Sequence, residues 1–273
     1  MTNPTNAQKF THSNRLEGSV VAITGAGSGN GKAAALRTGR EGASLYISDI
    51  NAELLEETIG DLKSEGINAQ GGIFDAANID DAPRFVAAVK EAHGRIDVLV
   101  NNAGAVKVEP FPNVSEENWD WTMNLNLKGA FFLMQEAAKP MIDQQSGNIV
   151  NIASIAGTFG GPTSSPSYAA AKAGLVNLTT VAAAVLAQYT IRVNAIAPGI
   201  INTPFHAPVD LAIGQEQLGL APGEHINTRV GLIPLGRLGE PEDVAATVAF
   251  LASEDAAHIS GETITVAGAM RSL

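Results

Sequence analysis

The residues best suited to chemistry are a tyrosine and a lysine four positions apart, Tyr168 and Lys172. Residues 144–209 carry only two permanent charges, Lys172 and Arg192, although 16% of the chain is charged. Because charges normally spread over solvated surfaces, a lone lysine in an alanine-rich segment is expected to be at least partly buried. The alanine-rich run favours a helix, so both side chains would share one helix face.

Such a pair predicts a proton-transfer site. A tyrosine with a pKa near 10 transfers protons poorly at neutral pH, and a nearby cation stabilises its phenolate. Lowering that pKa to about 7 requires about 4 kcal/mol, much of which one desolvated ammonium could supply. The alternative is that Lys172 reaches water while Tyr168 packs in a core, because this spacing also arises by chance.

The framework that positions these residues is predicted from the alternation of short apolar runs with longer helical stretches. The expected strands are residues 19–24, 44–48, 69–74, 96–100, 147–152, 191–196 and 263–266. The expected helices are residues 31–40, 52–65, 79–93, 115–142, 168–187 and 241–252. This order predicts an α/β fold, a single doubly wound Rossmann-type domain with a seven-stranded parallel sheet and helices on both faces.

The domain organisation follows from length and composition. With 273 residues, of which 45% are hydrophobic, the chain can bury one large core. Residues 1–15 are polar, so we expect a disordered tail, followed by one dinucleotide-binding catalytic domain over residues 16–273. Residues 204–234 interrupt the alternation and are too long for an ordinary loop, which predicts a substrate lid.

A glycine-rich turn follows the first expected strand and precedes a helix. Thr24, Gly25, Gly29 and Gly31 form the pattern, and glycines there let the backbone approach a diphosphate at the helix N-terminus. The strict Rossmann and Walker patterns both fail, and a Gly-rich turn can also simply be tight. Asp49 closes the second strand, where an acid can accept from a ribose hydroxyl and would repel a 2′-phosphate. This favours NAD over NADP, unless Asp49 only caps the next helix.

Composition excludes several classes of protein. The formal net charge is -11 and no basic tract occurs, which argues against nucleic acid as the main partner. Cysteine is absent, so disulfides and cysteine-ligated metals are excluded, and a cytoplasmic location is expected. The five histidines lack metal-ligand spacing, so we expect no metal. Residues 173–191 are uncharged, but internal polar residues and missing basic flanks favour a core or interface helix over a membrane span.

Together these features resemble the short-chain dehydrogenase/reductase family, over nearly the whole chain from about Leu16. The resemblance rests on the glycine turn, Asp49, residues 101–104 (Asn-Asn-Ala-Gly), the Tyr168–Lys172 pair and the Pro-Gly motif at residue 198. It implies the catalytic residues Asn126, Ser154, Tyr168 and Lys172. It implies that NAD is bound by Gly25, Ser28, Gly29, Asn30, Gly31, Asp49, Ile50, Asp75, Ala76, Asn102, Ala103, Gly104, Tyr168, Lys172, Pro198, Gly199, Ile201 and Thr203. This sequence departs from the family pattern at Asn30, where an aliphatic residue is usual, and at residues 266–270.

The resemblance implies reversible, NAD-dependent oxidation of a secondary alcohol to a ketone. Tyr168 would exchange the proton, Lys172 would lower its pKa, Ser154 would bind the substrate oxygen, and Asn126 would hold a water. The acidic lid favours a small free substrate. A 3-oxoacyl-thioester reductase of the same family and a non-catalytic dinucleotide-sensing member remain alternatives. The resemblance also implies a homotetramer or homodimer.

The sequence also predicts where four aromatic residues and one histidine lie. Phe159, Phe205 and His206 are candidates for the pocket wall. Trp119 and Trp121 are expected to pack at the start of the long helix over residues 115–142.

Overall fold

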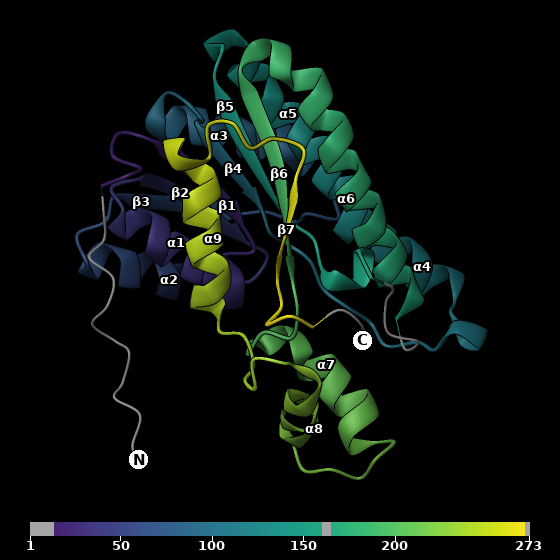
Figure 1. Cartoon of the computed structure of the whole chain (residues 1–273). Helices are drawn as coiled ribbons and strands as arrows, with labels where there is room; N and C mark the ends of the chain where they lie inside the picture. Colours follow the sequence, from purple (N-terminus) through teal and green to yellow (C-terminus); the bar gives the residue numbers. More distant parts are fainter. Residues whose placement is uncertain (1–13, 160–164, 271–273) are drawn as a thin grey trace.

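The computed structural model describes residues 14–159 and 165–270. Seven parallel strands form one sheet in the order β3-β2-β1-β4-β5-β6-β7 (Figure 1). The strands are β1 (Val20–Thr24), β2 (Ser44–Asp49), β3 (Ala69–Ile73), β4 (Val98–Asn101), β5 (Gly147–Ile152), β6 (Ile191–Pro198) and β7 (Thr263–Val266). The strand order reverses between β1 and β4, and ligands of doubly wound folds bind beyond the carboxyl ends of the strands at such a point. The predicted fold class is confirmed.

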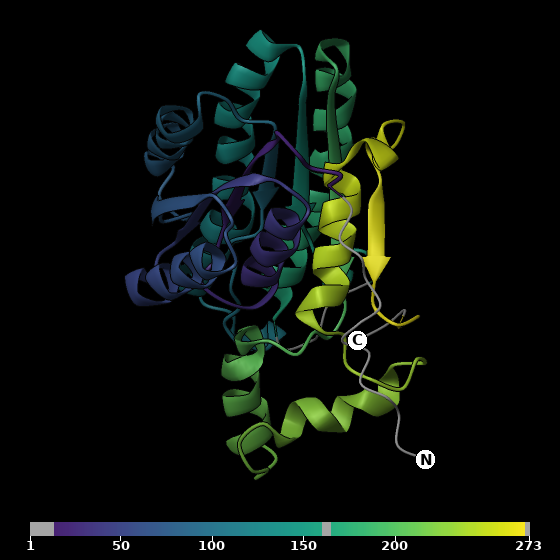
Figure 2. The same ribbon diagram turned by 90° about the vertical axis from the view of Figure 1, so that its left-hand side faces the viewer.

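Helices cover both faces of the sheet (Figures 1 and 2). One face is covered by α1 (Gly29–Arg40), α2 (Ala52–Ser64) and α9 (Pro241–Ala252), whose apolar residues share a core with the strands. The other face is covered by α3 (Asp81–His93), α5 (Gly129–Gln144) and α6 (Pro166–Leu186). Because helices cover both faces, the central strands are apolar on both sides, and every residue of β1 and β4 is buried.

The helix expected over residues 115–142 is divided into three parts. It consists of α4 (Glu116–Met123), a π-helical turn (Asn124–Lys128) and α5. At Gly129 the helix meets the loop after β3 so closely that a Cβ would lie 1.7 Å from the carbonyl oxygen of Ala76. The wider π turn adds one residue locally, and such turns occur frequently at functional sites.

The structure describes the expected lid but only the last two residues of the expected N-terminal tail. Residues 1–13 of the expected tail lie outside the described residues, while Arg15 already donates to Glu41 at 2.8 Å. The segment over residues 204–234 is mostly short helical pieces: α7 (Ala207–Val209), a π turn (Asp210–Gln215), α8 (Glu224–Thr228) and a 3₁₀ turn (Arg229–Leu232). It projects from the main body beyond the carboxyl ends of the strands (Figure 2).

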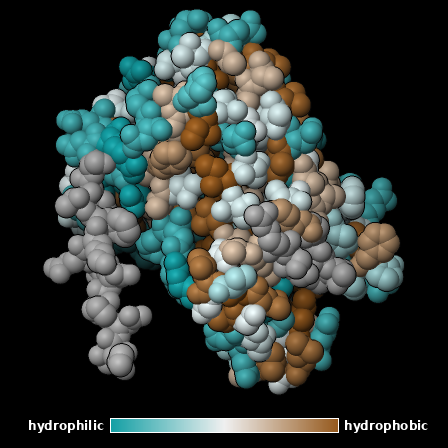
Figure 3. Space-filling view, in the orientation of Figure 1, coloured by the Kyte–Doolittle hydropathy of each residue, from teal (hydrophilic) through white to brown (hydrophobic). Residues whose placement is uncertain are grey.

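One helix of the described chain, Pro166–Tyr189, is long and apolar enough to cross a membrane, with 28% of its most apolar window buried. It comprises α6 and the short turn that follows, and its inner face packs against β6 and β5. Apolar residues also lie on its outer side (Figure 3), including Val181, which is 51% exposed, and Val185, which is 56% exposed. Since the helix packs on the sheet, its length and composition are weak evidence for a span.

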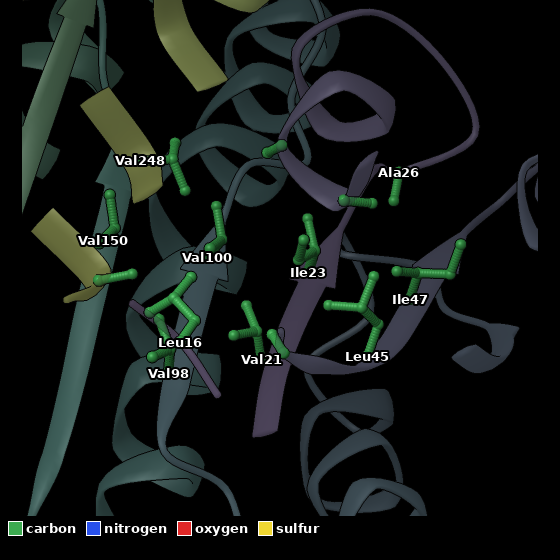
Figure 4. Close-up of a cluster of buried hydrophobic side chains, with 14 of the residues drawn as sticks. Leu16, Val21, Ile23, Ala26, Leu45, Ile47, Val98, Val100, Val150 and Val248 are labelled. Atoms are coloured by element: carbon green, nitrogen blue, oxygen red, sulfur yellow. The ribbon is translucent and has the colours of Figure 1, made fainter. Parts of the chain in front are cut away.

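The larger core cluster lies between the sheet and the α1–α2–α9 layer (Figure 4). Val21 and Ile23 of β1 meet Leu45 and Ile47 of β2 there, and all four are fully buried. Fully burying such a side chain contributes about 1.5–3 kcal/mol. This packing fixes the ends of β1 and β2, and therefore the loops that follow them.

Candidate active site

The turn between β1 and α1 is shaped by its glycines. Gly25 and Gly29 have φ angles of 64° and 51°, in the left-handed region that favours glycine. At Gly31 a Cβ would lie 2.1 Å from the carbonyl oxygen of Gly25, so only glycine fits. Asn102 of the loop after β4 donates to the carbonyl oxygens of Thr24 at 2.8 Å and Gly25 at 3.0 Å. These bonds hold the turn open beside the N-terminus of α1, where an anion is stabilised.

Asp49 lies at the end of β2, next to this turn. Its Oδ2 accepts from the backbone N–H of Gly27 at 2.9 Å, and its Oδ1 accepts from that of Asn51 at 2.9 Å. Asn51, not Asp49, is the N-cap of α2, because its side chain accepts from the N–H of Leu54. The capping alternative for Asp49 is therefore wrong. The carboxylate faces the same cavity as the glycine turn.

Tyr168 and Lys172 lie on the buried face of α6. Tyr168 is 9% exposed and Lys172 is 3% exposed, so the prediction of a buried lysine is confirmed. The Lys172 Nζ donates to the carbonyl oxygen of Ile152 at 2.8 Å and lies 5.7 Å from the centre of the Tyr168 ring. Ser154 follows β5, faces the same cavity, and accepts from the N–H of Ala156 at 3.1 Å. The structure thus brings Tyr168, Lys172 and Ser154 to one place from two elements.

Burial governs the protonation of the pair. It raises the pKa of the Tyr168 phenol, and a hydrogen bond with Ser154 opposes that rise only in part. Burial lowers the pKa of Lys172 to about 8. The expectation that Lys172 lowers the pKa of Tyr168 is therefore not met in the protein alone. The physical reason is that desolvation disfavours the charged forms of both groups.

Asn126 lies in the π turn, behind the loop that follows β4. Its Nδ2 donates to the carbonyl oxygens of Ala105 at 3.0 Å and Thr122 at 3.1 Å. Its Oδ1 is buried without a hydrogen-bond partner among the described residues. A Cβ at Gly104 would lie 2.7 Å from that oxygen and 3.4 Å from the Lys172 Nζ. Asn126 and Lys172 therefore both face the space beside Gly104, which is open only because that residue lacks a side chain.

A cavity of about 690 Å³ joins these features. Of the predicted site residues it is lined by Gly25, Ser28, Gly29, Asn30, Asp49, Ile50, Asp75, Ala76, Asn102, Ala103, Gly104, Ser154, Tyr168, Lys172, Pro198, Gly199, Ile201 and Thr203. Gly31 and Asn126 are not in its wall, because Gly31 packs under the turn and Asn126 lies behind Gly104. The cavity runs along the carboxyl ends of the strands, and in its wall the buried Oδ1 of Asn30 lacks a partner in the described chain. This shape and this free acceptor fit a dinucleotide.

The wall near Tyr168 is formed by the segment after β6. The Phe205 ring lies 5.6 Å from that of Tyr168, and the His206 ring lies 5.6 Å from that of Phe205. Burial, with smaller contributions from Arg229 and His225, lowers the pKa of His206 to about 4. Phe205 and His206 line the cavity as predicted.

Four other positions differ from the expectations or were not predicted. Phe159 does not line the cavity, and Trp119 is 42% exposed. Trp121 lines the cavity instead of only packing under the helix, with the Lys107 Nζ 4.4 Å from its ring centre. Arg229 also lines the cavity. Neither the break between α4, which carries Trp121, and α5 nor the fold of the lid that carries Arg229 leaves a local sequence signal.

A doubly wound sheet, a glycine turn at the switch point and a buried Tyr–Lys pair beside it define a dinucleotide-dependent oxidoreductase. The model of the short chain dehydrogenase family matches residues 19–213. The chain is 39% identical to the 3-oxoacyl-(acyl-carrier-protein) reductase of Thermotoga maritima, over 94% of this chain and 99% of the relative. It is 36% identical to the 7alpha-hydroxysteroid dehydrogenase of Bacteroides fragilis, over 94% and 96%. The crystal structure of levodione reductase superposes with a TM-score of 0.88 at 35% identity, over 93% and 98%.

The chain therefore belongs to the short-chain dehydrogenase/reductase family. Members of this family are oxidoreductases that use a nicotinamide dinucleotide, and the cavity described above fits that cofactor.

Proposed function

We propose that the protein is an NAD-dependent dehydrogenase that interconverts a small secondary alcohol and its ketone. The observation that carries the proposal is the meeting of Ser154, Tyr168 and Lys172 in the cavity that also contains the glycine turn and Asp49. A dinucleotide bound there would supply hydride transfer and, in its oxidised form, an additional positive charge. The four groups Asn126, Ser154, Tyr168 and Lys172 are the catalytic residues of the proposal.

Each of these side chains has one task. The Tyr168 phenolate takes the alcohol proton during oxidation, and the Tyr168 phenol returns it to the carbonyl oxygen during reduction. The Ser154 hydroxyl donates to the substrate oxygen, where negative charge develops. Lys172, anchored on Ile152, places its ammonium beside the phenolate. The free Oδ1 of Asn126 accepts from a water that passes the proton toward Lys172.

The proposed preference for NAD depends on Asp49. A 2′-phosphate beside this carboxylate would cost about 4 kcal/mol per unit charge at about 4 Å and an effective dielectric constant near 20, before screening. Residues 48–51 contain no lysine or arginine that would offset this repulsion. Asp49 would instead accept from the adenosine ribose hydroxyls.

The proposal also covers the lid, the cellular location and the oligomeric state of the enzyme. Residues 204–234 act as a lid, because they stand beyond the carboxyl ends of the strands and contribute Phe205, His206 and Arg229 to the cavity. We further propose a cytoplasmic homotetramer or homodimer. The exposed apolar residues Phe131, Val181 and Val185 on α5 and α6 support subunit contacts there, and light scattering after size-exclusion chromatography tests them.

A substrate screen tests the proposed activity directly. Several dozen secondary alcohols and ketones are assayed with NAD(H) and NADP(H), and 3-oxoacyl thioesters form a separate arm because of the 39% identical reductase. The proposal predicts turnover of free ketones, with kcat/KM higher for NADH. Turnover of thioesters alone would indicate that the substrate is bound to a carrier and is not a small free molecule. Dinucleotide binding without any turnover would instead favour a sensor.

A further inference from the structure

Arg229 lies at the substrate end of the cavity and has no partner among the described residues. It begins the 3₁₀ turn Arg229–Leu232, is half-buried, and lines the same cavity as Tyr168. The other arginines within residues 14–159 and 165–270 bind carboxylates or backbone carbonyl oxygens. Arg229 makes neither an ion pair nor a hydrogen bond within that part of the chain.

No carboxylate of the cavity is placed to neutralise this guanidinium. The acidic residues of the wall, Asp49 and Asp75, follow β2 and β3, whereas Arg229 belongs to the segment after β6, across β1, β4 and β5. In the lid, Asp210 is directed inward, accepting from the N–H of Gly223 at 2.8 Å and from Gln215 at 3.0 Å. Burial lowers the pKa of Arg229, and no acidic group opposes that shift.

An unpaired, partly buried guanidinium is costly, because the group loses hydration without gaining acceptors. A ligand that brings its own anionic group would recover that cost. The planar guanidinium matches carboxylate and sulfonate oxygens with two parallel hydrogen bonds.

The wall beside Tyr168 extends through Phe205 to His206. Ring contacts of 5.6 Å each connect Tyr168 to Phe205 and Phe205 to His206. His206 lies near Arg229, which contributes to its lowered pKa of about 4, so its imidazole is neutral at pH 7. Arg229 is therefore the cation at this end of the wall, and Phe205 supplies an apolar surface for the part of a substrate between the two polar ends.

We propose that the substrate carries an anionic group, a carboxylate or a sulfonate, remote from its hydroxyl or keto carbon, and that Arg229 binds this group. The inference rests on the proposed alcohol–ketone activity and narrows its substrate class to hydroxy acids and oxo acids.

The test compares acids with their neutral analogues on the full-length protein with NADH. Straight-chain oxo acids with increasing separation between keto and carboxyl groups are each paired with their methyl ester, and matching oxo sulfonates form a further arm. The wild type is expected to prefer the acid of the best length at least tenfold in kcat/KM. Arg229→Leu should lower the acid-to-ester ratio by about 10- to 100-fold, mainly through KM for the acid.

Controls separate anion binding from a general loss of structure. Arg229→Lys keeps the charge and should retain part of the preference. Arg84→Leu, at an exposed position on α3, removes an arginine outside the cavity and should leave the ratio unchanged. Equal NADH affinity of all variants, measured by fluorescence, shows that they are folded, and Arg229→Gln replaces the leucine variant if that one is unstable.

The outcomes distinguish the binding of an anionic group by Arg229 from the proposed alcohol–ketone activity. If ketones are reduced but the acid-to-ester ratio is the same in wild type and Arg229→Leu, the inference is wrong and the proposed activity stands. If nothing is reduced, the proposed activity is wrong, and calorimetric titration of the NADH-bound protein with the oxo acids decides the inference. Tighter binding to wild type than to Arg229→Leu supports it, and equal binding overturns it.

Discussion

Replacing Lys172 by methionine should change how stability depends on pH. Burial lowers the pKa of this lysine from its ordinary 10.5 to about 8. The unfolded chain therefore binds more protons than the folded protein between these values, so this group makes stability rise with pH across that window. Relative to a neutral side chain, the buried ammonium costs about 3 kcal/mol at pH 7 and about 1 kcal/mol at pH 9.5. In Lys172→Met this cost is absent.

The assay is urea unfolding of wild type and Lys172→Met at pH 7 and pH 9.5, at one fixed protein concentration. The free energy of unfolding of the variant minus that of the wild type should fall by about 2 kcal/mol from pH 7 to pH 9.5. Taking differences cancels the titration of the other groups. Lys90→Met removes an exposed lysine of α3, which is hydrated in both states, so its effect should change little with pH. A Lys172→Met difference equally independent of pH would refute the buried, desolvated ammonium.

Two further substitutions test the cofactor site and the fold. Asp49→Ser should raise the ratio of kcat/KM with NADPH to that with NADH at least tenfold, because it removes a carboxylate from the cavity wall. Steady-state kinetics with both cofactors measure this ratio. An unchanged ratio would show that Asp49 does not select between NAD and NADP. Glu41→Gln should destabilise the protein by about 1.5–3 kcal/mol at pH 7, because Arg15 and Arg37 lose a charged acceptor while Arg15 keeps its ion pair with Asp255. Burial opposes ionisation of Glu41, but the two guanidinium groups outweigh it and lower its pKa, so this stability is present above pH 4.5 and is lost as the pH falls further. Urea unfolding at pH 7 and pH 4 measures the effect, which would be contradicted by an equal or larger loss at pH 4.

The features that could be predicted from the sequence are those with a local or periodic signal. Apolar runs predicted the seven strands to within about two residues, because the central strands β1 and β4 are buried along their whole length and the others keep apolar residues where they face a core. The glycine turn was recognisable because Gly25 and Gly29 need positive φ angles and Gly31 has no room for a Cβ. The absence of other charges around Lys172 indicated its burial, since Lys172 lies on the buried face of α6.

The features that could not be predicted depend on contacts between distant segments. The π turn between α4 and α5, which carries Asn126, lies next to the close approach of Gly129 to Ala76, more than fifty residues away. Arg229 reaches the cavity only because the lid folds back over the sheet ends. The pKa of Tyr168 was expected to fall, because a sequence shows a neighbouring charge but not the full desolvation that raises it.

The most direct test of the central claim, that Tyr168 exchanges the substrate proton, is the kcat of Tyr168→Phe together with its NADH affinity. General acid–base groups contribute about 10²- to 10⁴-fold to rate, so kcat should fall at least 100-fold while NADH binding persists. Retention of more than a few per cent of the wild-type kcat would contradict the account.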